Sequence, residues 1–556
     1  MTSDISPDSS QINGNGGHSN GANMNGNGVH SNGINGHGIN GHATTSHIES
    51  KDGSKFPPVA ICGMACRLPG GISSPEQLWD YLIEGGDARS PVPKSRFNIS
   101  AYHSPVKKPG ASITEFGYFL DENVDLGALD TAFFSMPRSE VARLDPQQRL
   151  LLEVARESVD DGGEVGWKGS NIGVYVGTFS QDWYDSFNRE PLKYGVYQAT
   201  ATHDFMVSER LSHEMDLRGP SMTIRTACSS ALVGLNEACM AIGRGDCDSA
   251  IIGGTSIIMA PALMTAMSEQ GVLSPDGSCK TFSAGANGYA RGEAIVSFYV
   301  KSLDAAIRDG NPIRSVIAGT SVNFDGKTPT LSMPNPIAQE ALIRRAYKVA
   351  GISDFGKTGF FECHGTGTTS GDVCETSAIG AIFGQDGVHI GSIKPNLGHS
   401  EGASGLTSLL KAVLALEHRT IPPNIKSLPL NPKIPFEQSK LTVPNQPLSW
   451  PIDREERVSV NSFGVGGANA HVIVESAAKY TPSRGAVAPA ATTSNVPQLL
   501  LYSANTAQSL KDMTQNYHQF LGRTSMDLAD IAYTLANKRE HLPHRSLQWC
   551  KKTHSI

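Results

Sequence analysis

The sequence has no feature of a membrane-spanning, secreted or nucleic-acid-binding protein. No uninterrupted apolar run approaches the ~18 residues that a transmembrane helix needs, and the N-terminus has no basic-then-apolar signal. The net charge is -7 and no sustained basic block is present, so we expect neither nucleic acid nor a membrane as a partner. The nine cysteines form no CxxC pair, which argues against a disulfide framework and favours a reducing compartment, the cytoplasm.

Residues 1–55 also lack the means to fold. They are a mixture of Gly, Asn, Ser and His with almost nothing to bury, so we expect a disordered tail. Its histidines are irregularly spaced and no cysteine accompanies them, which makes a solvated tail a better interpretation than a metal-binding tract. Order is predicted from residue 56.

The rest of the chain alternates buried strands with amphipathic helices. Continuous apolar runs predict strands, apolar residues at helical spacing predict helices, and the scheme is repeated in a second half. This alternation is typical of an α/β layered fold. Strands are predicted at 58–64, 171–177, 221–224, 248–254, 292–300, 313–322, 359–362, 388–393 and 472–475. Helices are predicted at 74–86, 144–163, 231–242, 336–351 and 404–417, whereas 178–197 has few period signals and is predicted as a loop.

The stretch 221–245 has the clearest chemical signal. A short β-favouring run leads into RTACSS and helical apolar spacing follows, which predicts Cys228 at a strand-to-helix junction. Unpaired backbone N–H groups and the positive end of the helix dipole favour a thiolate there, which suits a nucleophile. The alternative is a small buried core residue, as most intracellular cysteines are.

Two histidines follow predicted strands of the second half. His364 stands in ECHGTGT and His399 in KPNLGHSEG, each beside glycine. Ligands of α/β sheets bind in the loops beyond the strand carboxyl ends, so both imidazoles are candidates to face one crevice with Cys228. Each alone is more often a structural histidine, satisfied by a neighbouring backbone group.

A glycine-rich run, NSFGVGGANAH at residues 461–471, is the third cluster. Its glycines let the backbone approach a ligand closely, and exposed N–H groups there could polarise a carbonyl. It is a poor dinucleotide fingerprint because its spacing is G-x-G-G, it precedes a strand, and no acidic residue follows at the required distance.

These motifs together resemble a known family. In the order found in the β-ketoacyl synthase (ketosynthase) domain of polyketide synthases, the chain contains MACRLPGG, LDPQQRLLLE, TACSSALVGLNEAC, MSEQGVLSPDGSCKTF, ECHGTGT, KPNLGHSEGASG and NSFGVGGANAHVI. Within that family it looks most like the fungal highly reducing type I iterative enzymes. The resemblance covers residues 57–475 and implies a thiolase-like five-layered α-β-α-β-α sandwich of two similar halves, in a homodimer.

The resemblance also implies the reaction, a decarboxylative Claisen condensation, and a role for each motif residue. Cys228 would accept an acyl chain as a thioester from an acyl carrier protein. His364 and His399 would promote decarboxylation of carrier-bound malonyl and donate hydrogen bonds to the enolate that attacks the acyl-cysteine. The backbone N–H groups of Cys228 and Val465 would form the oxyanion hole for the thioester carbonyl. Lys394 would orient the site by hydrogen bonding to acidic partners; the alternative is a solvated surface cation.

Partners and cofactors follow from the same resemblance. The chain itself is expected to bind no cofactor and no metal, because the phosphopantetheine is carried by the acyl carrier protein. No acyltransferase, dehydratase, reductase or carrier serine motif is present, so acyltransferase and carrier would be supplied by another chain. Malonyl and acyl thioesters are the expected substrates.

Some positions depart from the commonest family pattern without removing a catalytic group. Arg225 stands where many relatives have Asp, Val465 where Phe is frequent, and Glu209 where Asn usually precedes an arginine; GDVCE replaces the usual GDP-(apolar)-E. These departures put turnover and chain-length preference in question more than the reaction class.

The C-terminal region is predicted in two parts. Residues 477–497 are an Ala/Pro/Ser/Thr linker, and 498–556 resemble the start of the domain that joins a ketosynthase to an acyltransferase, with a strand at 498–504 and helices at 506–521 and 526–538. The resemblance stops near Leu547, where the next strand should lie, so this small α/β domain is predicted to be partial and truncated. The main hypothesis is a catalytic ketosynthase over 56–476. The alternative is a truncated synthase fragment that folds and dimerises but lacks the partner domains needed for product formation.

Overall fold

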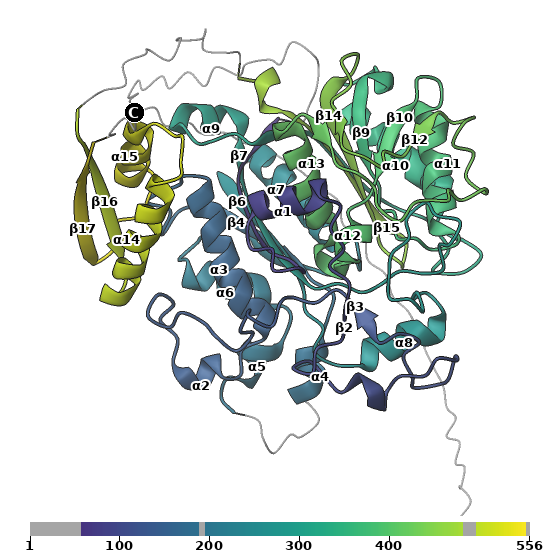
Figure 1. The fold of residues 1–556 in the computed structure, drawn as a ribbon, viewed down its shortest axis with the longest axis horizontal. Helices are drawn as coiled ribbons and strands as arrows, with labels where there is room; N and C mark the ends of the chain where they lie inside the picture. The colour runs from purple at the N-terminus through teal and green to yellow at the C-terminus, as the bar shows by residue number, and fades with distance from the viewer. Residues whose placement is uncertain (1–56, 188–194, 482–495, 552–556) are drawn as a thin grey trace, which may run out of the picture. The chain divides into compact units, whose positions relative to one another are not determined.

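The computed structural model describes residues 57–187, 195–481 and 496–551. The predicted tail at 1–55 lies outside these residues, as does most of the predicted linker at 477–497. Within the described residues, eleven strands form one mixed sheet (Figure 1). From edge to edge they are β12 (Leu441–Thr442), β10 (Val388–Gly391), β9 (Thr358–Glu362), β14 (Glu455–Phe463), β15 (Ala468–Ser476), β8 (Ser315–Phe324), β1 (Val59–Arg67), β7 (Ala294–Ser302), β6 (Ser249–Ser256), β4 (Ile172–Gly177) and β5 (Ser221–Ile224).

Strand β1 joins the two halves of this sheet. It pairs with β7 along most of its length, but with β8 only through Val59, Ala60 and Ile61. In the first half, β4 pairs in parallel with β5 and β6. In the second half, β9 pairs in parallel with β10 and β14. The two predicted halves are therefore present, and a short antiparallel junction makes their sheets continuous.

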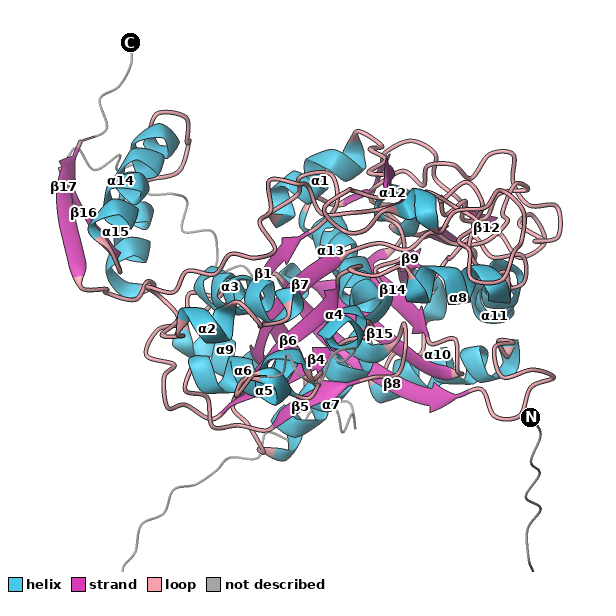
Figure 2. Cartoon of the chain, turned by 90° about the horizontal axis from the view of Figure 1, so that it is seen from below, coloured by secondary structure: helices cyan, strands magenta, loops and turns pink. Residues whose placement is uncertain are grey.

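Helices cover the outer faces of both halves and fill the space between them (Figure 2). Helix α3 (Pro146–Asp161) packs on β1 and β7 from one side, and α10 (Pro336–Val349) packs on β8 and β15 from the other. Helices α7 (Ser230–Arg244) and α13 (Ser404–Glu417) contact each other and strands of both halves. The fold is therefore the thiolase-like five-layered sandwich.

Separate apolar clusters fill the spaces between these layers. Strand β7 serves two of them, because Val296 and Phe298 pack with the central helices whereas Ile295 and Tyr299 pack with α3. A strand covered on both faces needs apolar residues throughout, which explains the continuous apolar run in its sequence. Helix α13 is buried on every side from Ser404 to Leu416 and lies wholly within the core.

The remaining helices of the main body are shorter or lie on its outside. In the described residues they are α1 (Pro75–Ile83), α2 (Arg138–Val141), α4 (Asp182–Phe187), α5 (Gln198–Thr202), α6 (Met206–Glu214), α8 (Ala262–Gln270), α9 (Leu303–Asp309), α11 (Gly371–Phe383) and α12 (Lys394–Leu397). Two small sheets pair β2 (Ser90–Pro91) with β3 (Phe116–Gly117) and β11 (Thr420–Ile421) with β13 (Leu448–Ser449). Helix α4 contradicts the predicted loop at 178–197; it is too short to show a period in the sequence.

The C-terminal residues form a small α/β unit with its own apolar cluster. It comprises β16 (Gln498–Ala504), α14 (Ala507–Leu521), α15 (Leu528–Asn537) and β17 (His544–Cys550). β17 pairs with β16 along its whole length, so the prediction that the next strand is missing is wrong. Several of its side chains are exposed and polar, so the sequence of this strand lacks the apolar pattern by which a strand is predicted. Arg539 donates to the carbonyl of Asp160, and Glu540 pairs with Lys168, which attaches the unit to the main body.

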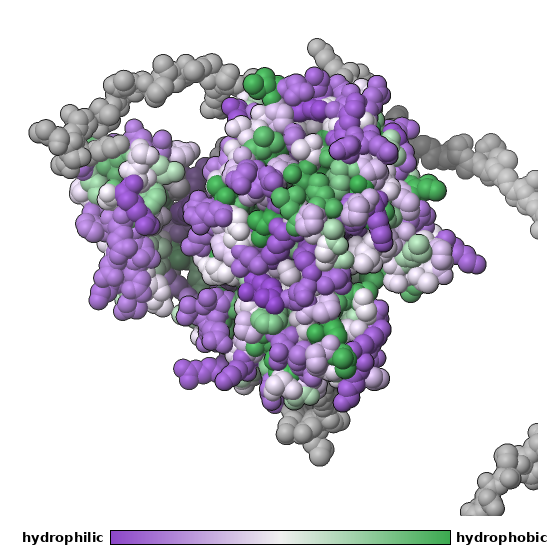
Figure 3. Space-filling view, turned by 45° about the vertical axis from the view of Figure 1, so that its right-hand side comes forward, coloured by the Kyte–Doolittle hydropathy of each residue, from purple (hydrophilic) through white to green (hydrophobic). Residues whose placement is uncertain are grey.

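The surface is mixed in character. On the face seen in Figure 3, hydrophilic side chains predominate and hydrophobic ones gather in scattered patches. Among the helices of the described residues, none has both the length and the apolar character that crossing a membrane requires.

Candidate active site

Cys228 lies in a tight turn between β5 and α7. Ala227 adopts a left-handed conformation with φ 57°, which is uncommon for a residue with a Cβ and marks a constrained turn. The carbonyl of Cys228 accepts hydrogen bonds from the hydroxyls of Ser404 (3.1 Å) and Ser462 (2.8 Å). Helix α13 and strand β14 of the second half therefore hold the turn that carries the thiol.

The glycine-rich loop between β14 and β15 packs against the same turn. A Cβ on Gly464 would lie 2.4 Å from the carbonyl oxygen of Thr226, so this approach requires glycine. The loop places the N–H of Val465 near the Cys228 thiol, and this N–H and that of Cys228 itself both act to lower the pKa of the thiol. The resemblance implies an oxyanion hole formed by these two N–H groups.

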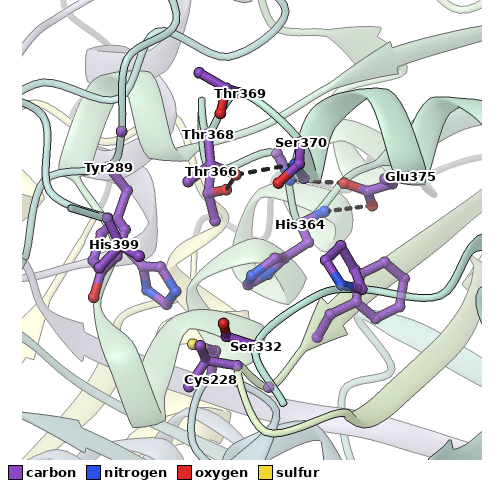
Figure 4. A pocket seen from close by; sticks show the side chains of 18 of the residues that line it. Cys228, Tyr289, Ser332, His364, Thr366, Thr368, Thr369, Ser370, Glu375 and His399 are labelled. Atoms are coloured by element: carbon purple, nitrogen blue, oxygen red, sulfur yellow. Dashed lines mark hydrogen bonds between the residues drawn. The ribbon is translucent and has the colours of Figure 1, made fainter. Parts of the chain in front are cut away.

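The structure brings Cys228, His364 and His399 together around one cavity of about 340 Å³ (Figure 4). A sulfur or ring nitrogen of each lies within 4.8 Å of one from each of the others. The two imidazole centroids are 5.3 Å apart and the rings are nearly perpendicular, at 86°. The three residues come from both halves of the fold, and the cavity forms where the halves meet.

The cavity lining combines hydroxyl groups with apolar side chains. Thr366, Thr368, Thr369, Ser370 and Ser332 supply hydroxyls (Figure 4). Phe179, Met267, Val272, Tyr289 and Phe463 supply apolar surface. A ligand with a polar arm and an apolar end would match both kinds of surface.

His399 is held as a hydrogen-bond donor. Its Nδ1 accepts a hydrogen bond from the backbone N–H of Glu401 at 2.9 Å, so the neutral ring carries its proton on Nε2. Burial, followed by the charges of Lys394 and Arg291, lowers the pKa of His399 well below its ordinary value. His399 is therefore a neutral imidazole with an N–H available at Nε2.

His364 is held through its backbone. Its N–H and that of Gly365 donate to the two oxygens of Glu375, at 2.8 and 2.9 Å, and Asn461 donates to the same carboxylate. Nδ1 of His364 has no hydrogen-bond partner within the described part of the chain. Burial, followed by the charge of Lys394, lowers the pKa of His364 well below its ordinary value. This second imidazole is also neutral.

The Cys228 thiol is not ionised in this site. Its pKa is raised to about 12, first by burial and then by the charge of Glu401, although Lys394 and the N–H groups of Val465 and Cys228 oppose the shift. The predicted thiolate is therefore not found: the N–H groups at the helix start do lower the pKa of the thiol, but the loss of water raises it by more. Nucleophilic attack by the sulfur requires a proton acceptor.

Lys394 is the cation whose charge acts most strongly on both imidazoles. It is 1% exposed, which excludes the solvated surface cation. Burial lowers its pKa, while Glu362 and Glu375 oppose that shift. Its ammonium makes no direct ion pair with any described residue, so the hydrogen bonds to acidic partners implied by the resemblance are not formed here.

Sequence patterns did not identify three further residues around His399. Arg291 Nε donates to Glu401 at 3.2 Å, with both side chains buried. The Tyr289 ring lies 5.0 Å from the His399 ring, and its hydroxyl lies 3.5 Å from the Glu401 carboxylate. Glu401 belongs to the GHSEG motif and could have been found from it; Tyr289 and Arg291 had no comparable signal.

One thiol and two imidazoles at these separations also form a candidate Zn²⁺ site. The hydrogen bond at His399 opposes that interpretation. A metal at Nε2 would move the ring proton to Nδ1, which already accepts the N–H of Glu401. The buried charges of Lys394 and Arg291 would also repel a cation. The arrangement fits acyl transfer and proton transfer better than metal binding.

Comparisons with known sequences identify the relatives of this chain. The pattern of the β-ketoacyl synthase N-terminal domain matches residues 57–306, that of the C-terminal domain 314–427, and that of the ketoacyl-synthetase C-terminal extension 430–548. The highly reducing polyketide synthase sphB of Aspergillus fumigatus is 60% identical over 491 residues, which are 88% of this chain and 19% of that protein. For VdtX of Byssochlamys spectabilis the identity is 54% over 488 residues, 88% of this chain and 22% of the relative. The chain thus spans about a fifth of the length of these highly reducing polyketide synthases.

Solved structures agree with the sequence comparison. The ketosynthase domain OzmH KS7 of the oxazolomycin synthase from Streptomyces albus JA3453 has a TM-score of 0.81 at 30% identity, covering 89% of this chain and 86% of that domain. The ketosynthase from module 6 of the bacillaene synthase from Bacillus subtilis 168 has a TM-score of 0.78 at 31% identity, covering 89% and 83%. Because the site and these relatives agree, we conclude that the chain belongs to the β-ketoacyl synthase family and is a condensing ketosynthase of the polyketide-synthase type.

Proposed function

We propose that Cys228, His364 and His399 carry out the decarboxylative Claisen condensation of polyketide biosynthesis, between an acyl-cysteine thioester and a malonyl group on an acyl carrier protein. One observation carries this assignment. A thiol and two neutral imidazoles, contributed by the two halves of the fold, share a single cavity.

The first step is acyl transfer to Cys228. Sγ attacks the carbonyl carbon of an acyl thioester, the new C–S bond forms, and the bond to the carrier's phosphopantetheine sulfur breaks. His364 takes the thiol proton, because His399 offers only an N–H, and passes it to the departing carrier thiolate. The N–H groups of Cys228 and Val465 stabilise the oxyanion between these events.

The second step is decarboxylation of malonyl-carrier. The bond to the carboxylate breaks, CO₂ leaves, and the electron pair forms the enolate of the carrier thioester. His399 donates Nε2–H to the enolate oxygen and His364, neutral again, donates its own N–H; each donor is worth about 3 kcal/mol, as for other oxyanion donors. The enolate carbon then attacks the acyl-cysteine carbonyl, the C–S bond to Cys228 breaks, and the departing thiolate takes up a proton from water.

The partners in this proposal are an acyl carrier protein and an acyltransferase on another chain or segment. The carrier's phosphopantetheine arm contains amides, and the hydroxyls of Thr366, Thr368 and Ser370 give the cavity matching hydrogen-bonding groups. The arm arrives as part of the substrate and stays on the carrier. This chain is not assigned a cofactor of its own.

A homodimer is part of the same proposal. Strand β5 ends the sheet and, among the described strands, pairs only with β4. Its Met222 is 46% exposed. An open edge with an exposed apolar side chain favours pairing with another chain, and a second copy aligned antiparallel would continue the sheet. Replacing Met222 with Lys should raise the dimer dissociation constant in sedimentation experiments.

A cytoplasmic location is supported by the thiols. All nine cysteines are free and seven of them are buried, which suits a reducing compartment. This part of the proposal is tested by fractionating cells that express the full chain.

CO₂ release from malonyl-carrier tests the proposed reaction. Wild type should release CO₂ at least 100-fold faster than His399→Ala, whereas Cys228→Ala should still release CO₂ but form no acyl-enzyme. A wild-type rate no faster than that of His399→Ala would contradict the proposal. A folded dimer that releases no CO₂ would instead support the truncated-fragment hypothesis.

A further inference from the structure

We propose that Lys411 is a positioning residue for this reaction: by pairing with Glu362 in the core, it leaves Lys394 free to face His364 and His399. The inference rests on the proposed function of those two histidines. It assigns a role to a charged residue that lies outside the cavity and outside the motifs identified in the sequence.

Lys411 and Glu362 form an ion pair that is completely buried. Nζ and Oε2 are 2.8 Å apart, and both side chains are 0% exposed. Lys411 comes from the middle of α13, and its ammonium also lies 5.2 Å from the ring centroid of Phe360. Glu362 is the last residue of β9, two positions before His364.

Glu362 also contacts the segment that carries Lys394. Its second oxygen accepts the backbone N–H of Ile393 at 2.7 Å, one residue before Lys394. One carboxylate therefore connects the end of β9, the start of α12 and, through Lys411, the middle of α13. His364 follows β9, Lys394 begins α12, and His399 lies between α12 and α13.

Stability does not account for this pair. Charges inside a core lose hydration, and a buried ion pair is often no more stabilising than apolar side chains of the same volume. Helix α13 is buried from Ser404 to Leu416, so a leucine or methionine at position 411 would suit its surroundings. The cation at this position needs another explanation.

The charges around Lys394 supply that explanation. The groups that interact with its ammonium are the carboxylates of Glu362, Glu375 and Asp372, the thiols of Cys228 and Cys279, and the imidazoles of His364 and His399. Glu362 is ion-paired with Lys411, and Lys394 makes no direct ion pair within the described residues. If Lys411 were neutral, Glu362 would be a buried unpaired carboxylate and would attract Lys394 away from the histidines.

The test uses variants in a Cys228→Ala background, so that the thiol cannot titrate, and follows CO₂ release from malonyl-carrier between pH 7 and 10.5. Lys411→Met should lower the plateau rate of CO₂ release about tenfold. It should also shift the alkaline limb, the fall in rate at high pH, to higher pH, because Lys394 gains a carboxylate partner and stays protonated to a higher pH. Lys411→Met with Glu362→Gln should retain most of the plateau rate. Its alkaline limb should shift to lower pH, because Lys394 loses a favourable negative charge.

These opposite shifts separate positioning from a structural role. If Lys411→Met does not fold, the double variant carries the test alone, and an alkaline limb identical to that of the parent overturns the inference. Lys168→Met removes an exposed ion pair with Glu540 and serves as the control that should leave the profile in place. If the Cys228→Ala parent releases CO₂ no faster than the same protein with His399→Ala, the proposed function itself fails. If it is faster but neither Lys411 variant shifts the alkaline limb of the pH–rate profile, only the role of Lys411 fails.

Discussion

The two central helices begin alike but carry different chemistry. The segment before each contains a non-glycine residue at positive φ, Ala227 at 57° before α7 and Glu401 at 45° before α13. The start of α7 presents one thiol surrounded by backbone N–H groups. The start of α13 follows an imidazole held by a backbone N–H and surrounded by buried charges. The same position in each half thus presents a thiol in one and an imidazole with an available N–H in the other.

Charge is also distributed unequally between the halves. The first half contributes Cys228, whose thiol burial keeps protonated. The second half contributes both histidines and the carboxylates and lysines behind them. In the proposed condensation neither set suffices alone, because the thiol needs a proton acceptor and the enolate formed at the histidines needs an acyl-enzyme to attack. Variants that separate the two contributions test this comparison directly.

The largest effect is expected from Cys228→Ala. Removal of the one thiol among the described residues that line the cavity should abolish covalent acylation while decarboxylation continues through the second half. Intact-protein mass spectrometry after incubation with an acyl thioester should find the acyl mass on wild type and none on the variant. An acylated Cys228→Ala protein would contradict the division of labour between the halves.

His399→Ala should have the converse effect. Loss of the Nε2–H donor should slow CO₂ release about 10²- to 10³-fold, because one hydrogen bond to the enolate oxygen disappears. Acylation of Cys228 should change by less than tenfold, since His399 offers the thiol no proton acceptor. His213→Ala is the control, because its side chain is 81% exposed and distant from this chemistry. Equal losses in both steps would mean that the halves do not act separately.

Local patterns predict the reacting groups but not their environment. Cys228 and His364 follow strands β5 and β9, and His399 follows the short helix α12; each stands in a recognisable motif, so their positions could be predicted from neighbouring residues alone. The raised pKa of Cys228 could not, because its turn is closed by Ser404 and Ser462, which are 176 and 234 residues away. Burial of the thiol is decided by those distant contacts.

The same distinction applies to the fold. Strand and helix positions of the first half follow from apolar periodicity, and β4 and β5 lie within a residue of their predicted limits. The junction of β1 with β8 depends on pairing between distant segments, which no local pattern records. In the sequence, Lys411 looks like a residue on the polar face of an amphipathic helix. Its burial follows only from the packing of α13 between the two halves of the sheet.

A smaller effect is expected at the contact between the central helices. A Cβ on Gly405 would lie 2.5 Å from Cγ of Leu232, so Gly405→Ala should lower the free energy of unfolding by about 1–3 kcal/mol despite the better helix propensity of alanine. Urea denaturation measures this change. Adding Leu232→Ala should make the Gly405→Ala penalty smaller, and additive losses would contradict direct contact. Gly466→Ala, with open space around its Cα, is the control.

The smallest effect concerns acid sensitivity, which we assign to the second half. Burial lowers the pKa of His471 to about 3, and its Nδ1 contacts the Asn461 amide oxygen at 2.7 Å. An unfolded histidine titrates near pH 6.5, so below that pH the unfolded chain holds a proton that the folded chain lacks, and stability falls as pH decreases. From pH 7.5 to pH 5 this one histidine should remove about 2 kcal/mol, a loss that His471→Gln should not show. As the pH is lowered over that range, the urea midpoints of wild type and His471→Gln should converge. The midpoints of wild type and the exposed control His213→Gln should instead change in parallel. Parallel behaviour of His471→Gln would mean that the folded protein accepts this proton, and the buried second half would then be no more acid-sensitive than the exposed surface of the first.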